Sequence, residues 1–196
     1  MEALAGTRCP WCGDDPRYVA YHDEEWGVPC RDEGRLFELL VLEGMQAGLS
    51  WLTILRKRDA FRRAFHGFDA ERIARYGDRD RSRLLADPGI VRNRAKIDAT
   101  IGNARALLAL RERSGSLADV LWEAVDGRPL QGHYRTHAEV PARTPVSEAL
   151  SRRLRGLQFR FVGPTIVLAL MQAAGLANDH LLGCPRHAAC AALADA

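Results

Sequence analysis

An apolar run with helical spacing, closed by a single acid, is the feature that most constrains how this chain folds. Leu36, Leu39 and Leu40 lie seven, four and three residues before Glu43, so on a helix all four side chains share one face. A carboxylate on such a face costs on the order of several kcal/mol of desolvation unless it gains a partner. Two interpretations stay open: Glu43 accepts hydrogen bonds from backbone amides in the core, or it is the acid of a functional pocket.

The residues after Glu43 predict a tight turn between two helices. Two glycines follow within five residues, so the first helix is expected to cover about residues 33–46. Ser50 is placed to cap a second helix, to about residue 65, which begins with Trp51. An acid and an indole are therefore expected on either side of one turn.

Helical signals recur along the rest of the chain. Asp69 and Asp80 are placed to cap short helices, and a long helix is predicted from about Asn93 to Arg113. Further helices are predicted at 116–125, 147–154 and 164–175, with a polar loop at 127–145. No two-residue alternation of strand length stands out. The fold class is therefore predicted to be all-α, and 196 residues suffice for one domain with its own core.

Composition narrows the class of protein. Hydrophobic residues make up 47% and charged residues 27%, as in soluble globular proteins. No secretory signal is visible in Met1–Ala5, and the most apolar run, Pro164–Ala177, is short of a membrane span, so a cytoplasmic protein is expected. Net charge is only +3, but Lys57 and Lys96 are the only lysines, and the remaining cations are arginines. Arginine suits phosphate recognition, although a preference for arginine also arises from genome composition.

The five cysteines gather near the two ends of the chain, which favours a metal site over disulfides. His180 and Cys184 form a His-x3-Cys pair, while Cys9 and His22 stand at the other end. Two cysteines and two histidines complete a tetrahedral Zn²⁺ shell with no position left for water, which predicts a structural ion. The spacing leaves other ligands open, namely Cys12, His187 and Cys190, and it also fits free cysteines with surface histidines.

Two glycine-containing stretches are suited to binding a nucleic-acid backbone. In the first, Gly89 precedes the three cations Arg92, Arg94 and Lys96 at the start of a helix. In the second, Phe161-Val162-Gly163 forms a turn between two helices, followed by Thr165. A glycine turn that leads into a helix presents free amides to phosphate. The alternative is an ordinary helix connection with a solvated basic face.

Together these motifs resemble the bacterial 3-methyladenine DNA glycosylase I family over about residues 8–184. The motifs that carry the resemblance are Cys9 with Trp11, Asp15-Pro16, Tyr18, Tyr21-His22-Asp23-Glu24-Glu25-Trp26-Gly27-Val28-Pro29, Leu42-Glu43-Gly44, Gln46-Ala47-Gly48-Leu49-Ser50-Trp51, Gly89-Ile90, Arg92, Arg94, Lys96-Ile97, Gly102-Asn103-Ala104-Arg105, Phe161-Val162-Gly163, Met171-Gln172-Ala173, Gly175-Leu176 and Asn178-Asp179-His180.

The resemblance implies a helix-hairpin-helix DNA glycosylase fold in one domain, residues 1–196. Zinc would join the terminal segments 8–33 and 176–190, and residues 87–175 would carry the DNA-binding hairpin. The implied zinc ligands are Cys9, His22, His180 and Cys184. The implied DNA contacts are Arg92, Arg94, Lys96, Phe161, Val162, Gly163 and Thr165.

The resemblance also implies a base pocket and a reaction. Glu43 would accept hydrogen bonds from the base, and the surrounding residues would be Trp11, Tyr18, Tyr21, Trp26 and Trp51. Asn178 would stand where related glycosylases carry an aspartate that stabilises the sugar cation. The expected enzyme is a monomer that flips 3-methyladenine out of alkylated double-stranded DNA and releases it by simple hydrolysis, in a bacterial cytoplasm and at the nucleoid when bound to DNA.

The chemistry of the lesion suits these residues. A 3-alkylated adenine in DNA is a cationic ring, which aromatic faces attract by about 0.5–2 kcal/mol each, and a carboxylate accepts charge-assisted hydrogen bonds from its amine.

Two rival functions also fit the sequence. One is a zinc-stapled DNA-binding module without catalysis, and the other is a zinc hydrolase built on His22-Asp23-Glu24.

Overall fold

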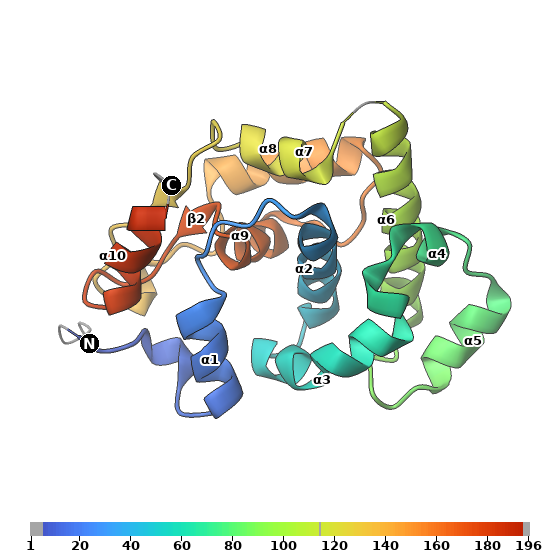
Figure 1. The fold of residues 1–196 in the computed structure, drawn as a ribbon, viewed down its shortest axis with the longest axis horizontal. Coiled ribbons are helices and arrows are strands. Elements are labelled where there is room, and N and C mark those ends of the chain that lie inside the picture. The colour runs from blue at the N-terminus through green and yellow to red at the C-terminus, as the bar shows by residue number, and fades with distance from the viewer. Residues whose placement is uncertain (1–5, 114, 194–196) are drawn as a thin grey trace.

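The computed structural model describes residues 6–113 and 115–193, and their architecture is helical, as the sequence predicts (Figure 1). The α-helices are α1 (Pro16–Glu24), α2 (Glu33–Gln46), α3 (Trp51–Ala64), α4 (Ala70–Ala74), α5 (Asp78–Ala86), α6 (Arg94–Glu112), α7 (Leu117–Glu123), α8 (Pro145–Gly156), α9 (Pro164–Ala173) and α10 (Pro185–Ala192). Short elements are the 3-10 turns η1 (Pro10–Cys12), η2 (His66–Phe68) and η3 (His137–Glu139) and the strands β1 (Leu130–Gln131) and β2 (Ala177–Asn178). Within the described ranges, no helix combines the length with the apolar character that crossing a membrane requires.

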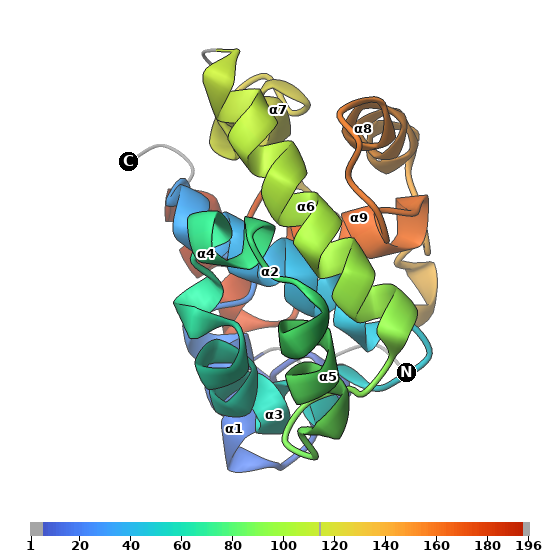
Figure 2. The same ribbon diagram turned by 90° about the vertical axis from the view of Figure 1, so that its right-hand side faces the viewer.

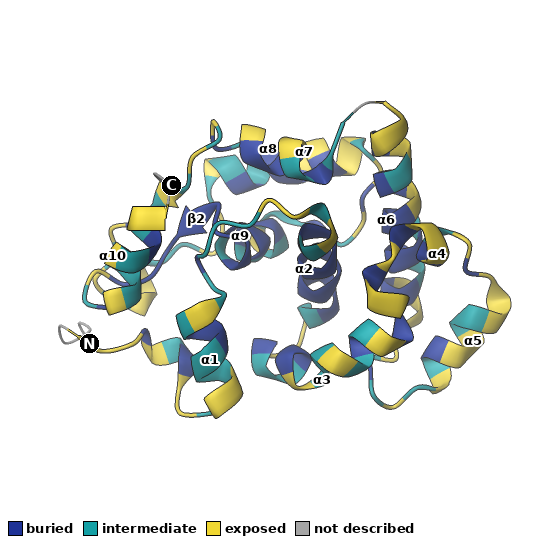
Figure 3. Ribbon diagram, viewed as in Figure 1, coloured by how far each residue is buried: buried dark blue, intermediate teal, exposed yellow. Residues whose placement is uncertain are grey.

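Helix α2 is the centre of the core. All its residues from 36 to 45 are buried, and it packs against α3, α6, α7 and α9 (Figure 3). A helix that is buried on all sides needs apolar residues around its whole circumference, which the run Leu36–Leu42 supplies. The long α6 crosses over one side of α2, and α8 packs on α9 (Figure 2). Glu43 therefore lies in the buried part of this central helix.

Local capping bonds start the helices largely where the sequence predicts them. Ser50 accepts from the backbone N–H of Thr53 at the start of α3, and Asn93 and Asp69 cap α6 and α4 in the same way. The expectation for Asp80 is wrong. Helix α5 begins at Asp78, directly after its cap residue Gly77. Asp80 lies in the first turn, and its carboxylate accepts a hydrogen bond from the Gly77 N–H.

The structure contains elements that the sequence analysis did not predict. Helix α1 follows Asp15, whose side chain accepts from the Arg17 N–H, and α10 begins directly after Cys184. The loop expected at 127–145 holds β1, which pairs in parallel with β2 in the register Leu130 to Ala177. Two-residue strands are too short to produce alternation, and this pair depends on segments far apart in the chain.

The described segments nearest the two ends of the chain lie at one side of the molecule (Figure 1), and the Gly6 N–H donates to the Gly183 carbonyl at 3.0 Å. The segment after α1 crosses the end of α9, with Cys30 N–H bound to the Ala174 carbonyl at 3.0 Å. At Gly175, where φ is +71°, an added Cβ would lie 2.3 Å from the carbonyl carbon of Val28. Only glycine permits both that backbone conformation and this close crossing.

Ion pairs hold the first three α-helices to one another. Glu25, at the end of α1, receives two hydrogen bonds from Arg58 of α3 at 2.7 and 2.9 Å, and it also pairs with Arg35 of α2. Glu38 of α2 accepts from Arg62 of α3 at 2.9 Å. Because α1, α2 and α3 all contribute to the cavity described next, these partly buried pairs help to keep its walls in place.

Candidate functional site

A cavity of about 450 Å³ lies between α1, α2, α3 and α9. All six residues predicted to bind a base line it: Trp11, Tyr18, Tyr21, Trp26, Glu43 and Trp51. They come from η1, α1, the segment after α1, α2 and α3, so packing of the whole N-terminal third of the chain brings them together. The volume suits a small planar ligand.

The aromatic side chains form a connected cluster around Trp11. Its ring centroid lies 4.9 Å from that of Trp26 and 5.0 Å from that of Tyr18, while Tyr21 and Trp51 are 5.3 Å apart. The rings are tilted or edge-on to one another, so each is held by its neighbours and their faces are not stacked together. Burial raises the pKa of both tyrosine hydroxyls, which therefore stay neutral.

Glu43 is 4% exposed, and within residues 6–113 and 115–193 its carboxylate has neither a hydrogen-bond partner nor an ion-pair partner. The interpretation that it accepts from backbone amides in the core is therefore wrong. Burial raises its pKa to about 8, because the charged form loses water and gains no compensating contact. Beside it the buried indole N–H of Trp51 also lacks a partner among the described residues. Unsatisfied polar groups in a cavity are typical of a ligand site.

The cavity has further lining residues that the sequence analysis did not assign. Asp179 is buried and accepts a hydrogen bond at 2.7 Å from Gln172, and both side chains line the cavity. The motifs Met171-Gln172-Ala173 and Asn178-Asp179-His180 are part of the family resemblance, but the sequence analysis gave Gln172 and Asp179 no role. The segment 137–142 forms another wall and carries no recognisable sequence signal. Asn178 points elsewhere: its amide donates to Gln131 and to the His187 carbonyl.

The predicted DNA-binding hairpin lies between α8 and α9 and has a special backbone. Gln158 and Phe161 have φ of +70° and +54°, a left-handed conformation that costs non-glycine residues roughly 1–3 kcal/mol. Val162 is buried, so its backbone rather than its side chain is what this turn can offer to a ligand. Gly163 caps α9, and Thr165 in the first turn of α9 also lines the cavity. The start of α9, directly after the hairpin, thus reaches the cavity.

The three cations predicted to contact DNA near α6 do not lie together. Arg92 and Arg94 are exposed, and the Arg94 side chain is 72% accessible. Lys96 is instead buried at 8% exposure, and its ammonium donates to the carbonyls of Met45 and Ala47 at 2.8 and 2.6 Å. The structure therefore separates Lys96 from the two arginines, because it faces the end of α2.

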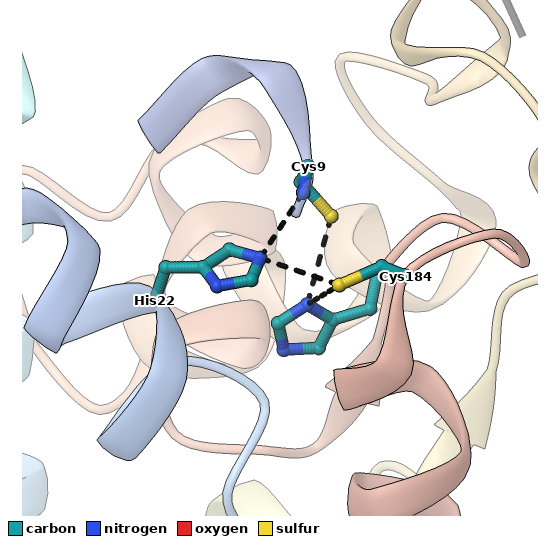
Figure 4. Close-up of side chains that lie close together, drawn as sticks. Cys9, His22 and Cys184 are labelled. Carbon is teal, nitrogen blue, oxygen red and sulfur yellow. Dashed lines mark hydrogen bonds between the residues drawn. The ribbon is translucent and has the colours of Figure 1, made fainter. Parts of the chain in front are cut away.

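The four predicted metal ligands converge where the chain ends meet. One ligand atom from each of Cys9, His22, His180 and Cys184 lies within 4.8 Å of the others, and all four residues are buried. Three of the sulfur–nitrogen distances are 3.6, 3.6 and 3.8 Å (Figure 4). A tetrahedral shell with bonds of about 2.0 to 2.3 Å places its ligand atoms about 3.3 to 3.8 Å apart, so this group could hold a metal ion.

The surroundings of the cluster also suit metal binding. The second ring nitrogen of His22 lies 2.8 Å from the Asp23 carboxylate, and that of His180 lies 2.9 Å from the Trp26 carbonyl. Such partners orient an imidazole ligand and fix its tautomer. Hydrogen bonding with Cys9 holds the pKa of the Cys184 thiol well below its usual range, although burial opposes this.

The three alternative ligands lie outside this group of four. The Cys12 thiol donates to the Cys9 carbonyl, and the thiol of Cys190 lies 3.6 Å from the guanidinium of Arg186. A ring nitrogen of His187 lies 2.8 Å from the Gly132 carbonyl. The sequence spacing alone left these residues open, and the tertiary fold separates them.

Comparison with known proteins agrees with this site. The model of the methyladenine glycosylase family matches residues 11–187. DNA-3-methyladenine glycosylase 1 of Escherichia coli (strain K12) is 48% identical over 177 residues, which cover 90% of this chain and 95% of the relative. The relative from Haemophilus influenzae, a DNA-3-methyladenine glycosylase, is 44% identical over 179 residues, with 91% and 97% covered.

Solved structures give the same result for the fold. A crystal structure of 3-methyladenine DNA glycosylase I matches with a TM-score of 0.90 and 50% identity, covering 91% of this chain and 98% of that one. The Staphylococcus aureus 3-methyladenine DNA glycosylase I matches with a TM-score of 0.88 and 38% identity, covering 92% and 96%. By sequence and by structure, this chain belongs to the methyladenine glycosylase family that its motifs resemble.

Proposed function

We propose that this chain is a DNA repair N-glycosylase that flips 3-methyladenine out of alkylated double-stranded DNA and hydrolyses its bond to the sugar. The observation that carries the proposal is Glu43, a buried carboxylate in an aromatic cavity that has no partner among the residues the structure describes. The names of the relatives support it, and one relative with 38% identity was solved in complex with 3-methyladenine. A phosphate-binding module has no need of such a buried acid.

The cavity accounts for recognition of a charged base. While it is joined to DNA, a 3-alkylated adenine is a permanent cation, and the faces of Trp11 and Trp51, which line the cavity, attract it. The Glu43 carboxylate accepts from the exocyclic amine and opposes the ring's positive charge. An unmodified adenine is neutral and lacks both the cation–π attraction to the rings and the charge attraction to Glu43, so selectivity follows from charge more than from shape. Extracting the base costs a few kcal/mol, and a weakly paired lesion costs least.

The residues available favour hydrolysis over a Schiff-base reaction. The lysines of the chain are bound elsewhere: Lys57 donates to the Pro88 carbonyl, and Lys96 donates to the end of α2. Neither one is among the residues that line the cavity. Alkylation already makes the base a good leaving group, so the protein chiefly supplies flipping, orientation and a dry pocket.

The raised pKa of Glu43 predicts a characteristic pH profile for excision. Below pH 8 the free enzyme holds mostly the neutral acid, since the pKa is raised to about 8, and the anion that binds the cation forms as pH rises. We expect kcat/KM to increase about tenfold per pH unit at low pH and to level off above about pH 8. Single-turnover release of 3-methyladenine between pH 6 and 9, corrected for enzyme-free loss, measures this. A flat profile for the native protein would contradict the role of Glu43.

The DNA-binding surface in this proposal combines the hairpin with the start of α6. Backbone amides around Gly163, at the N-terminus of α9, face a phosphate, and the exposed Arg92 and Arg94 add positive charge. Leu49 is 44% exposed in the turn between Glu43 and Trp51, so it is placed to fill the space that a flipped base leaves.

Shortening Leu49 is therefore expected to impair flipping. Leu49→Ala should slow release of 3-methyladenine from duplex DNA by about tenfold, because the shorter side chain leaves the place of the flipped base in the stack unfilled. On single-stranded DNA, where no stack must be opened, the loss should be much smaller. The control is Leu193→Ala, which removes a leucine that is also 44% exposed but lies at the end of α10. Equal losses on both substrates would remove Leu49 from this role.

The proposal includes a structural Zn²⁺ held by Cys9, His22, His180 and Cys184. Four protein donors complete a tetrahedral shell, so the ion would tie the segments 8–33 and 176–190 together and leave no position for a reacting water. This argues against a zinc hydrolase built on His22-Asp23-Glu24, because a metal with four protein ligands has no open position for a reacting water.

We also treat the chain as one domain that acts as a monomer, with residues 87–175 carrying the hairpin. One continuous cluster of buried apolar residues extends from Tyr21 to Ala177, which supports a single folding unit. Sedimentation of the protein with and without duplex DNA tests the oligomeric state.

One assay tests the function directly. The protein is incubated with methylated duplex DNA, and released bases are separated by chromatography, with an enzyme-free sample to account for spontaneous loss. We expect free 3-methyladenine at early times. A protein that binds this DNA but releases nothing above the enzyme-free control would be a binding module, and the proposed activity would be wrong.

A further inference from the structure

The ammonium of Lys96 is bound to the end of the helix that carries Glu43. It donates to the Met45 carbonyl at 2.8 Å and to the Ala47 carbonyl at 2.6 Å, and the residue is only 8% exposed. The last carbonyls of a helix lack intrahelical partners and carry the negative end of its dipole, so a buried cation there stabilises the helix end. Leu49 and the start of α3 follow directly, so Lys96 is bonded to two carbonyls at the beginning of this turn.

Asn103 makes an equivalent contact with the hairpin. Its side-chain oxygen accepts from the Arg160 N–H at 2.7 Å, and its amide nitrogen donates to the Arg160 carbonyl at 3.1 Å. Arg160 lies between Gln158 and Phe161, the two residues with positive φ. A strained backbone persists only when its surroundings hold it, and Asn103 supplies two hydrogen bonds at the centre of the turn.

The two contacts share one face of α6. Asn103 follows Lys96 by seven residues, about two helical turns, so both side chains point the same way. The hairpin also touches α2 directly, since a Cβ added to Gly44, next to Glu43, would lie 3.2 Å from the Cβ of Phe161. The cavity enclosed between α2, α6 and the hairpin at this junction has a volume of only about 10 Å³. With so little space, a shift of one element must move the others.

We propose that Lys96 and Asn103 are positioning residues through which α6 holds the turn after α2 and the hairpin in one fixed arrangement. This rests on the proposed glycosylase function. A duplex bound by the hairpin then presents its lesion to the cavity that Glu43 lines, and Leu49 lies where the flipped base has left the stack. Lys96 acts on two carbonyls rather than on a phosphate, which differs from the role that the sequence resemblance implied.

The salt dependence of DNA binding separates these two roles of Lys96. Each cation that neutralises a phosphate adds about 0.9 to the slope of log affinity against log salt. Lys96→Met, which retains the length of the side chain, should leave the slope of binding to undamaged duplex unchanged. The matched variant Arg94→Met, two residues earlier and exposed, should reduce the slope by about 0.9. A reduction of the same size in Lys96→Met would overturn the proposal, because it would place the ammonium on a phosphate.

Excision kinetics test the positioning role. Lys96→Met should slow the maximal single-turnover release from duplex DNA by about tenfold while changing duplex affinity by less than about threefold. On single-stranded methylated DNA the deficit should shrink, since no base must be flipped. Affinity for free 3-methyladenine, followed by tryptophan fluorescence, should stay unchanged because the cavity is intact. Equal deficits on both DNA forms, or no deficit, would contradict the proposal.

Asn103→Asp provides an independent test that does not depend on Lys96→Met folding. Aspartate retains the acceptor for the Arg160 N–H and loses the donor to its carbonyl, so the hairpin loosens. We expect duplex affinity to fall about tenfold with free 3-methyladenine affinity unchanged. An unchanged duplex affinity would overturn the role of Asn103. If the native protein released no 3-methyladenine at all, the proposed function would fail, whereas the salt slopes would still report where the Lys96 ammonium lies.

Discussion

Replacing Glu43 with glutamine is expected to lower kcat/KM for release of 3-methyladenine by about 100-fold. The change keeps the shape of the side chain but removes the charge that opposes the cationic base. A hydrogen bond to a charged group contributes about 1.5–3 kcal/mol, and the lost attraction to the ring adds to this. Single-turnover assays on methylated duplex DNA at pH 8.5, where the native side chain is mostly ionised, give the largest contrast.

The same substitution should stabilise the folded protein at high pH. The pKa of Glu43 is raised to about 8 in the fold, from an ordinary value of 4.5, because burial removes water from the charged form. Folding therefore favours the protonated acid, and stability falls as pH rises from about 4.5 to 8 and is level beyond. Over that range the native protein loses roughly 4 kcal/mol that Glu43→Gln retains. Denaturant unfolding at pH 5 and pH 8.5 measures the difference.

Glu38→Gln is the matched control on the same helix. Its carboxylate is also buried but pairs with Arg62 at 2.9 Å, so its removal should destabilise the protein rather than stabilise it. Excision at a temperature where both variants are folded should stay within about threefold of the native rate. Excision by Glu43→Gln at the native rate, with the pH-dependent gain in stability present, would show that the acid is buried but does not take part in the reaction.

Removing one donor of the Cys/His cluster is expected to have the second large effect. His180→Ala should abolish stoichiometric zinc and lower the free energy of unfolding by about 3 kcal/mol or more, because the proposed ion would join segments from the two ends of the chain. For a chain of this size the melting temperature should drop by roughly 6–12 °C. Elemental analysis of purified protein and thermal unfolding by circular dichroism measure the two effects together.

His187→Ala is the control for His180→Ala. This histidine lies outside the cluster and contacts the Gly132 carbonyl at 2.8 Å, so its loss should leave the zinc content intact and cost only about 1 kcal/mol. Chelation of the native protein should reproduce the instability of His180→Ala. Full zinc content in His180→Ala would mean that the ligand set is wrong, whatever the change in stability.

Features encoded within a few residues could be predicted from the sequence. The cap at Ser50 and the long helix that begins at Asn93 depend on hydrogen bonds over three residues and on apolar spacing over a few turns. The same local information placed Glu43 on an apolar face. The family motifs correctly indicated the family, and they named the four residues that come together in the Cys/His cluster.

Other features depend on which segments meet in space. Nothing within several residues of Glu43 indicates that its carboxylate finds no partner, because a donor could have come from any helix packed on α2. The same holds for Lys96, whose long side chain turns to carbonyls about fifty residues earlier in the chain, and for Asp179, which enters the cavity beside Gln172.

The sequence by itself therefore determined the helical class, most helix starts, the family and the acid at the centre of the site. Only the tertiary structure decided that this acid finds no partner in the described part of the chain and has a raised pKa, and that α6 bonds to both the hairpin and the turn after α2. The physical reason is range. Periodicity and capping act between neighbours in the chain, whereas the desolvation of a carboxylate depends on everything that surrounds it.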